Sequence, residues 1–221
     1  MLKYFISFCF AFMALFVKAE SISSPSGNII LKFNLGEEGI PTYQLSYKGI
    51  QVIKPSSLGF KIKGGNSLLD HFRIIDSSTS YNDDTWKPVW GESSQIRNHY
   101  NELLIKLEKP SDECFVNVRF RVYDDGVGFR YEFPSQSNLS YFVIEEECTQ
   151  FAMSGDHTAW WIPGDYDTQE FDYTESKLSE IRGLLSQMIE SKLSHSIISP
   201  TSVQTSLQMK SSRNYLYLRI L

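Results

Sequence analysis

Regular alternation of apolar and polar residues is the feature that most limits what this chain can fold into. The run from Phe115 to Val122 alternates in this way, and Asp124-Asp125-Gly126 then leads into a second alternating run that ends at Phe133. A period of two places one face of a strand in a core and the other in water. Asp-Gly is a common hairpin turn, so we predict a hairpin from Phe115 to Phe133.

Short alternating runs of the same kind recur along the chain. Many short strands with turn residues between them favour one antiparallel β-sandwich. The further strands predicted are Ile29–Leu35, Tyr43–Tyr47, Leu58–Lys63, Tyr141–Glu145, Thr158–Ile162, Val203–Met209 and Tyr215–Ile220.

One segment has a helical period instead. We predict a flanking helix over Glu175–Ser191, with Thr174 as its N-cap and Gly183 weakening its middle. Its apolar face would consist of Leu178, Ile181, Leu184, Leu185 and Met188.

Length and charge exclude some classes of protein. The 221 residues suit one domain, or one domain with part of another, and 42% hydrophobic residues are enough for a core. The net charge of −5 is spread along the chain without a basic run, so no nucleic-acid partner is expected.

The N-terminus has the pattern of an export signal. Lys3 precedes an apolar run from Tyr4 to Val17, and Ala19 offers a small residue for cleavage. The run is shorter than the roughly 20 apolar residues that span a bilayer. We therefore expect residues 1–19 to be removed, with no membrane attachment afterwards and a periplasmic location for the mature chain.

Common catalytic motifs are missing from the sequence. There is no Gly-x-Ser-x-Gly elbow, no His-Glu-x-x-His pair and no phosphate-binding glycine loop. The histidines stand far apart and are expected to be structural or on the surface; Cys114 and Cys148 leave open whether they pair. The histidines are His71, His99, His157 and His195.

The densest group of polar and aromatic residues runs from Trp160 to Tyr173. Two tryptophans lead into a Pro-Gly turn and then into Asp165, Asp167, Glu170 and Asp172. Such a loop can offer oxygen ligands to Ca²⁺ or border a sugar site, and the aspartates can equally be turn formers. Its spacing does not match an EF-hand, so any metal would need ligands from elsewhere.

A second dense stretch lies at Trp86–Glu92 and Ile96–Leu103. One interpretation is a polar, aromatic surface that meets a ligand or another domain. The other is a loop whose tryptophans cap the sandwich, held by an Arg97–Glu102 ion pair.

Four separated motifs together resemble glycoside hydrolase family 97, and most closely its α-glucosidases from Bacteroides-type gut bacteria of the starch-utilisation kind. The likeness extends from the N-terminus to about Leu218. The motifs are Trp86–Glu92, Ile96–Leu103, Asp125–Pro134 and Trp161–Glu170.

This resemblance implies a galactose-mutarotase-like β-supersandwich that precedes a catalytic (β/α)₈ barrel and packs against it. The sandwich of the family supplies one carboxylate to a Ca²⁺ ion at the active site. The matching position here is Glu170, while Asp165 and Asp167 are expected to shape the loop. The loop near Ser191–Ser194 departs from the family pattern, so no substrate role is transferred to it.

The resemblance also implies that the sandwich is incomplete at its C-terminus and that the barrel is absent. Glycoside hydrolysis needs a pair of carboxyl groups across the scissile bond, and the family places these on the barrel. We therefore expect the domain at residues 20–221 to be inactive alone and to act on α-linked oligosaccharides only with its barrel. Preference for α-glucosides over α-galactosides and the stereochemical outcome stay open.

Two alternatives remain at this stage. The chain can be a stand-alone carbohydrate-binding module, with Trp160, Trp161 and the aspartates as an exposed platform. It can also be a non-functional gene fragment with an open sheet edge.

Overall fold

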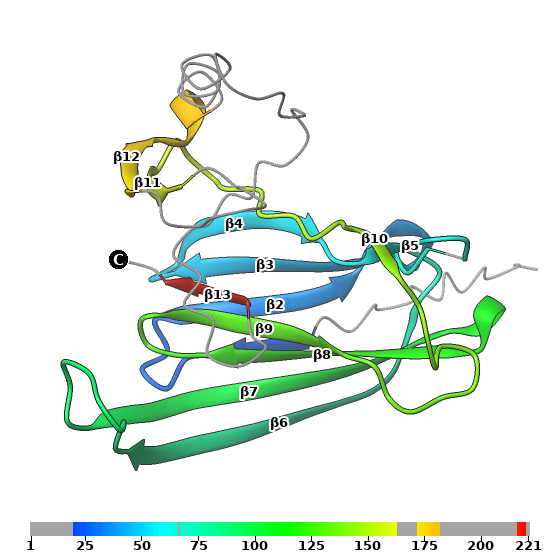
Figure 1. The fold of residues 1–221 in the computed structure, drawn as a ribbon, viewed down its shortest axis with the longest axis horizontal. Coiled ribbons are helices and arrows are strands. Elements are labelled where there is room, and N and C mark those ends of the chain that lie inside the picture. Colours follow the sequence, from blue (N-terminus) through cyan, green and yellow to red (C-terminus); the bar gives the residue numbers. More distant parts are fainter. Residues whose placement is uncertain (1–19, 66, 163–171, 182–215, 220–221) are drawn as a thin grey trace, which may run out of the picture.

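The computed structural model describes residues 20–65, 67–162, 172–181 and 216–219, the last of these as backbone. All strand pairs in this part are antiparallel. The first of two large sheets has four strands in chain order (Figure 1). These are β1 (Glu20–Ser23), β2 (Ile29–Leu35), β3 (Pro41–Tyr47) and β4 (Ile50–Ser57).

The second large sheet has five strands in the order β13-β9-β8-β7-β6. Four of them form a meander of successive hairpins, and β13 adds to the free side of β9. The strands are β6 (Arg73–Trp86), β7 (Ile96–Lys109), β8 (Cys114–Val122), β9 (Gly126–Glu132) and β13 (Leu216–Arg219).

The core lies between the inner faces of these two sheets. β8 alternates buried and half-buried side chains along its whole length. Its Phe120 ring centroid lies 6.1 Å from that of Phe33 on β2, and the Tyr43 ring on β3 lies 5.8 Å from Phe129 on β9. Burying a side chain of this size stabilises a fold by roughly 1.5–3 kcal/mol. The predicted antiparallel β-sandwich is confirmed, as is the hairpin from Phe115 to Phe133.

Two further pairs of short strands lie outside the large sheets. One joins β5 to β10, and the other joins β11 to β12. Figure 1 shows the β11–β12 hairpin standing out beyond β4. The bounds are β5 (Phe60–Ile62), β10 (Ile144–Glu147), β11 (Thr158–Trp161) and β12 (Thr174–Lys177).

The predicted helix over Glu175–Ser191 is wrong at its start. Residues 174–177 form β12, and the next three form a single 3₁₀ turn. All four residues of β12 are polar, with exposed Glu175 and Lys177 on either side of buried Ser176. Pairing with β11 satisfies their backbone groups, which a lone helix start would leave open. Residues 182–191 lie outside the described part. Within it, Ile181 is helical, and the named helical elements are the 3₁₀ turns η1 (Glu37–Gly39), η2 (Pro110–Asp112) and η3 (Leu178–Glu180).

The sequence left open whether the two cysteines pair, and the structure answers this question. Cys114 is buried and Cys148 half-buried, and both are free thiols. Among the described residues, no helix has the length and apolar character to cross a membrane.

Candidate functional site

The β11–β12 hairpin holds both ends of the acidic segment that the sequence singled out. Its register pairs Trp161 with Thr174 and Thr158 with Lys177. The chain from Ile162 to Tyr173 is therefore the connection of a two-stranded hairpin. This register fixes where the segment starts and where it returns.

A small apolar cluster, separate from the main core, supports the hairpin. Trp161 is 2% exposed and packs with Ala159 and Ile181. The indole Nε1–H of Trp161 donates to Ser176 Oγ over 3.0 Å, and that hydroxyl donates to the Lys177 carbonyl over 3.1 Å. A buried indole N–H needs such an acceptor, and Ser176 supplies it from β12. In the predicted helix the Ser176 side chain would instead have faced solvent.

Polar contacts join the hairpin to the turn that follows it. The Asp156 carboxylate accepts hydrogen bonds from the backbone N–H and the hydroxyl of Ser179, at 2.9 and 2.8 Å. Both bonds favour the ionised form and lower the pKa of Asp156 below its ordinary value. Lys177 Nζ also donates to Thr158 Oγ1 across the strands at 3.2 Å. Sequence reasoning missed Asp156 and Ser179, since neither stands in a motif.

The residues predicted to bind or flank calcium lie outside the described part of the chain. These are Glu170, Asp165 and Asp167. Nearest to them, Asp172 is exposed and Tyr173 is 59% exposed. Within the described ranges, no group of three His, Cys, Asp or Glu side chains is arranged to hold a metal ion.

The prediction that Trp160 and Trp161 form an exposed platform is wrong for Trp161. Trp160 is 40% exposed, whereas Trp161 points into the small cluster. Adjacent residues on a strand face opposite sides, so the pair cannot present two rings to one sugar. This weakens the hypothesis of a stand-alone sugar-binding module built on these residues.

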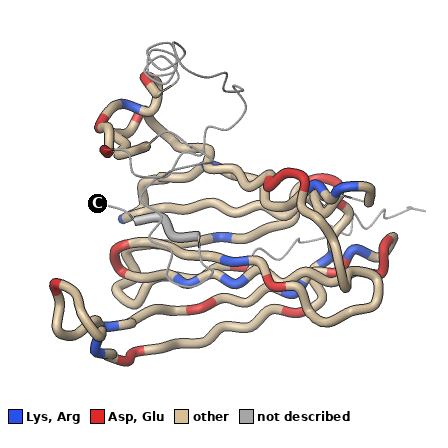
Figure 2. The backbone as a smooth tube through the Cα atoms, in the orientation of Figure 1, with Lys and Arg blue, Asp and Glu red and all other residues tan. Residues whose placement is uncertain are grey.

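A second group of charged side chains covers the outer face of the five-stranded sheet. Glu102 on β7 is only 7% exposed and accepts hydrogen bonds from Arg119, and from Arg121 at 2.8 Å. Glu132 on β9 accepts from Arg119 at 2.6 Å and from Arg130 at 2.7 Å. Figure 2 shows acidic and basic positions interspersed on these strands. Each carboxylate is bound by two arginines, which makes this a structural network rather than a pair of free acids and bases.

The expected Arg97–Glu102 ion pair is therefore wrong. Arg97 instead donates to both carboxylate oxygens of Asp83 on β6, at 2.7 and 2.8 Å. The register explains the difference, because Asp83 lies opposite His99, so that Arg97 is its diagonal neighbour two positions away on the same face of the β6–β7 ribbon. Glu102 faces Arg121 directly across β7 and β8.

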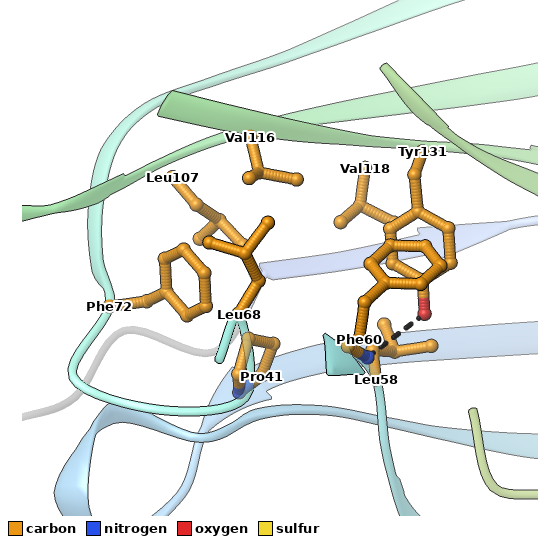
Figure 3. A pocket seen from close by; sticks show the side chains of 10 residues that line it. Pro41, Leu58, Phe60, Leu68, Phe72, Leu107, Val116, Val118 and Tyr131 are labelled. Atoms are coloured by element: carbon orange, nitrogen blue, oxygen red, sulfur yellow. Dashed lines mark hydrogen bonds between the residues drawn. The ribbon is translucent and has the colours of Figure 1, made fainter. Parts of the chain in front are cut away.

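An internal cavity lies between the sheets, at the end away from the β6–β7 turn. Pro41, Phe60, Phe72 and Leu107 are among its apolar lining residues (Figure 3). Its single polar feature is the Tyr131 hydroxyl, which accepts the Gly59 N–H at 3.1 Å. With a volume of about 10 Å³ it has room for one water molecule at most, so it is no sugar site.

Comparison with known proteins decides the family. The model of the glycosyl hydrolase 97 N-terminal domain matches residues 22–221. The chain belongs to glycoside hydrolase family 97.

Relatives within the family are enzymes of greater length. A family 97 enzyme from Pseudoalteromonas sp., solved in complex with acarbose, is 33% identical with a TM-score of 0.67, covering 73% of this chain and 25% of that one. A retaining α-galactosidase from Bacteroides thetaiotaomicron is 28% identical over 176 residues, which cover 74% of this chain and 25% of that enzyme. The family 97 domain described here thus spans about a quarter of the relatives it matches.

A more distant structure shares the fold. A β-arabinopyranosidase superposes with a TM-score of 0.62 at 24% identity, covering 70% of this chain and 26% of that one.

Three of the four family motifs gather at one end of the family 97 sandwich. Trp86–Glu92 and Ile96–Leu103 flank the turn from β6 to β7. Because β8 runs antiparallel to β7, its turn into β9 at Asp124–Gly126 lies at that same end. The fourth motif enters the β11–β12 hairpin at Trp161.

The histidines do not form a site within the described part of the chain. His99 contacts Tyr81 through a 3.2 Å hydrogen bond and an edge-on ring contact. The Nδ1 atom of His71 lies 3.0 Å from Oδ1 of Asp70. The His157 carbonyl accepts the Leu178 N–H at 3.1 Å. The prediction of structural or surface roles holds for these three, and His195 lies outside the described residues.

Proposed function

We propose that this chain is the non-catalytic N-terminal domain of an exported, calcium-dependent α-glycosidase. It packs on a (β/α)₈ barrel and contributes one ligand to the calcium site there. The observation that carries this proposal is the family 97 N-terminal match over residues 22–221. An acarbose-bound relative that contains this domain as a quarter of its length supports it.

The charged residues of the sandwich agree with a non-catalytic role. Hydrolysis of a glycoside needs one carboxyl group ready to donate a proton and another placed to attack or to activate water. Glu102 and Glu132 are each bound by two arginines, which holds both in the ionised, acceptor-only state. We therefore assign the acid and base of the reaction to the barrel.

Glu170 is the proposed calcium ligand of this domain, with Asp165 and Asp167 shaping the loop around it. Calcium takes six to eight oxygen ligands and prefers carboxylates. A single carboxylate from this domain would leave the remaining positions to the barrel, the substrate and water. The β11–β12 register supports the assignment, because it ties both ends of the acidic segment to a braced hairpin.

A chimaera tests this proposal. Residues 20–221 replace the matching N-terminal quarter of the Pseudoalteromonas enzyme, and hydrolysis of α-glucosides and α-galactosides is followed while calcium is titrated. Glu170→Gln is expected to raise the calcium concentration for half-activity at least about tenfold, because even the loss of an outer-shell partner typically lowers metal affinity about 10–100-fold. Glu175→Gln, on the exposed side of β12, is the matched control. Equal calcium dependence of the two variants removes Glu170 from the site.

Export is a separate part of the proposal. Expression of residues 1–221 in a Gram-negative host should yield a periplasmic chain whose N-terminus, measured by mass spectrometry, is Glu20. Recovery of the uncut chain in the cytoplasm would contradict this part alone.

A further inference from the structure

Half of the β6–β7 hairpin extends past the rest of its sheet. β6 pairs with β7 over Arg73–Trp86, whereas β8 pairs with β7 only from Asn101 to Lys109. Residues 81–100, which we call the arm, are therefore a two-stranded ribbon and its turn (Figure 1). An isolated ribbon of this kind is marginally stable in water.

The tip of the arm exposes large apolar side chains. Val89 is 99% exposed and Trp90 is 89% exposed. Trp86, at 50%, and Ile96, at 38%, face each other across the last strand pair before the turn. The alternative interpretation of this stretch, tryptophans that cap the sandwich, is therefore wrong. Four such side chains expose on the order of 500 Å², a patch size that often marks an interaction site.

The arm below the tip is braced by polar contacts between its two strands. The bidentate Asp83–Arg97 pair is followed by the 3.2 Å bond between Tyr81 and His99. Asn82 Nδ2 also donates to the Asn98 carbonyl over 2.7 Å. These bonds hold the outer part of the ribbon in one shape, while Tyr100 at its base is the one buried side chain of the arm. A surface that is ordered beforehand loses less entropy on binding.

The direction of the strands shows at which end of the sandwich β13 finishes. β7 runs away from the tip, and each antiparallel step reverses direction, so β8 and β13 both run toward it. β13 is the last strand of the described chain. In a polypeptide as long as the relatives, which are about three times the length of this chain, a segment that continues directly from β13 starts at the end where the arm projects.

We propose that the tip of the arm docks against the catalytic domain that follows the matched quarter in the longer relatives. This inference rests on the function proposed above and names the surface through which the two domains meet. Exposed tryptophans are the side chains most often found at the centre of interfaces. Domain interfaces within a chain bury roughly 600–1,500 Å², to which the tip contributes one part.

A second copy of the chain is a poorer occupant for this surface. A stable dimer buries about 800 Å² on each partner, more than the tip offers. A domain on the same polypeptide needs less area, because the covalent link keeps its effective concentration high.

Thiol labelling of the tip tests the proposal. Val89→Cys is placed in a Cys148→Ser background, which leaves Cys114 buried at 3% exposure. Its reaction with a maleimide is timed in residues 20–221 alone and in the chimaera with the Pseudoalteromonas enzyme. Docking is expected to slow the reaction about tenfold or more in the chimaera, since labelling then waits for local opening.

Ser111→Cys is the matched control, because Ser111 is exposed and lies in η2 at the opposite end of β7. It should react at one rate in both proteins. An equal rate for Val89→Cys in the two proteins overturns the proposal. A rate that falls with rising concentration of residues 20–221 alone overturns it in favour of self-association.

The two proposals fail in different measurements. A chimaera that hydrolyses α-glycosides with calcium dependence, yet labels freely at position 89, keeps the proposed function and rejects the arm. A protected thiol at position 89 in an inactive chimaera keeps the docking proposal and rejects the proposed function. If the chimaera does not fold, the same two thiols are timed in residues 20–221 with and without the separately expressed remainder of the Pseudoalteromonas enzyme, and the same outcomes decide.

Discussion

The β8–β9 hairpin and the β6–β7 arm are neighbours in one sheet but differ in what covers them. β8–β9 buries Phe120 and Phe129 in the core on one face and places Arg119 and Glu132 in an ion network on the other. The arm buries only Tyr100, at its base, and has one exposed ion pair between Asp83 and Arg97; most of its side chains are exposed. One hairpin is stabilised by its own domain, whereas the other is held by strand-to-strand contacts and presents an apolar tip to something outside it.

The largest expected contrast comes from removing an aromatic ring from each region. Phe120→Ala should lower the free energy of unfolding by about 3–5 kcal/mol, because it empties a fully buried position. Trp90→Ala should change it by less than about 0.5 kcal/mol, as expected for an exposed site. Urea denaturation of residues 20–221 measures both. A large loss with Trp90→Ala would mean that the tip packs within the domain.

Two glycines with nearly equal φ angles make a matched pair. Gly59 has φ +143° and Gly91 has φ +141°. A Cβ on Gly59 would lie 2.3 Å from the Leu68 carbonyl oxygen, whereas one on Gly91 would meet nothing within 4 Å. Backbone strain of this kind costs about 1–3 kcal/mol, so we expect Gly59→Ala to lose about 3 kcal/mol and Gly91→Ala about 1 kcal/mol in thermal unfolding. Equal losses would show that the backbone angle alone decides.

The ion network should make the stability of the body of the domain depend on pH. Burial raises the pKa of Glu102, but hydrogen bonds from Arg121 and Arg119 outweigh it and leave that pKa below its ordinary value. The Arg119 hydrogen bond likewise lowers the pKa of Glu132. A lowered pKa contributes stability above the ordinary value of 4.5, and this stability is lost as pH falls through the folded-state pKa.

Glu102→Gln is the variant that checks this. It should cost about 2 kcal/mol at pH 7, since two arginines lose their charged partner, and should flatten the decline in stability below about pH 4.5. Trp90→Ala, on the arm, removes no titratable group, so it is the control and should leave the pH profile unchanged. A profile that stays as steep in Glu102→Gln would place the acid sensitivity elsewhere.

The smallest effect is expected in the arm itself. Hydrogen bonds from Arg97 hold the pKa of the Asp83 carboxyl at about 2, below its ordinary 3.8. Arg97→Gln should return that pKa toward 3.8 in an NMR titration, without a measurable change in the melting temperature, because the pair is exposed. A drop in melting temperature would show that the arm unfolds together with the sandwich.

This comparison also explains which parts could be predicted from the sequence. Strands with one face in the core alternate apolar and polar residues, so β2, β3, β8 and β9 were predicted with nearly correct bounds. β6 has no buried face, so its residues do not alternate in this way, and its run of Ser, Thr, Asn and Asp does not predict a strand. β12 was not predicted as a strand either, because all four of its residues are polar. The apolar residues that follow it have helical spacing and suggested a helix instead.

The candidate site was predictable only through the family resemblance. Glu170 stands among four carboxylates whose spacing fits no metal motif, and nothing local separates it from Asp165 or Asp167. The support of the site was not predictable, because the bond from Trp161 to Ser176 joins residues 15 positions apart. Arg97 was given the wrong partner because the strand register, which decides its contacts, was not known.

The separate cluster beneath the β11–β12 hairpin has a consequence for how ligand binding can be detected. Three buried side chains hold this hairpin, far fewer than hold the sandwich, so it should open on its own, long before the whole domain unfolds. Any ligand held by the connection between its strands then adds its binding free energy to the closed hairpin by mass action. Amide exchange in β11 and β12 would therefore report occupancy at a distance from the ligand itself.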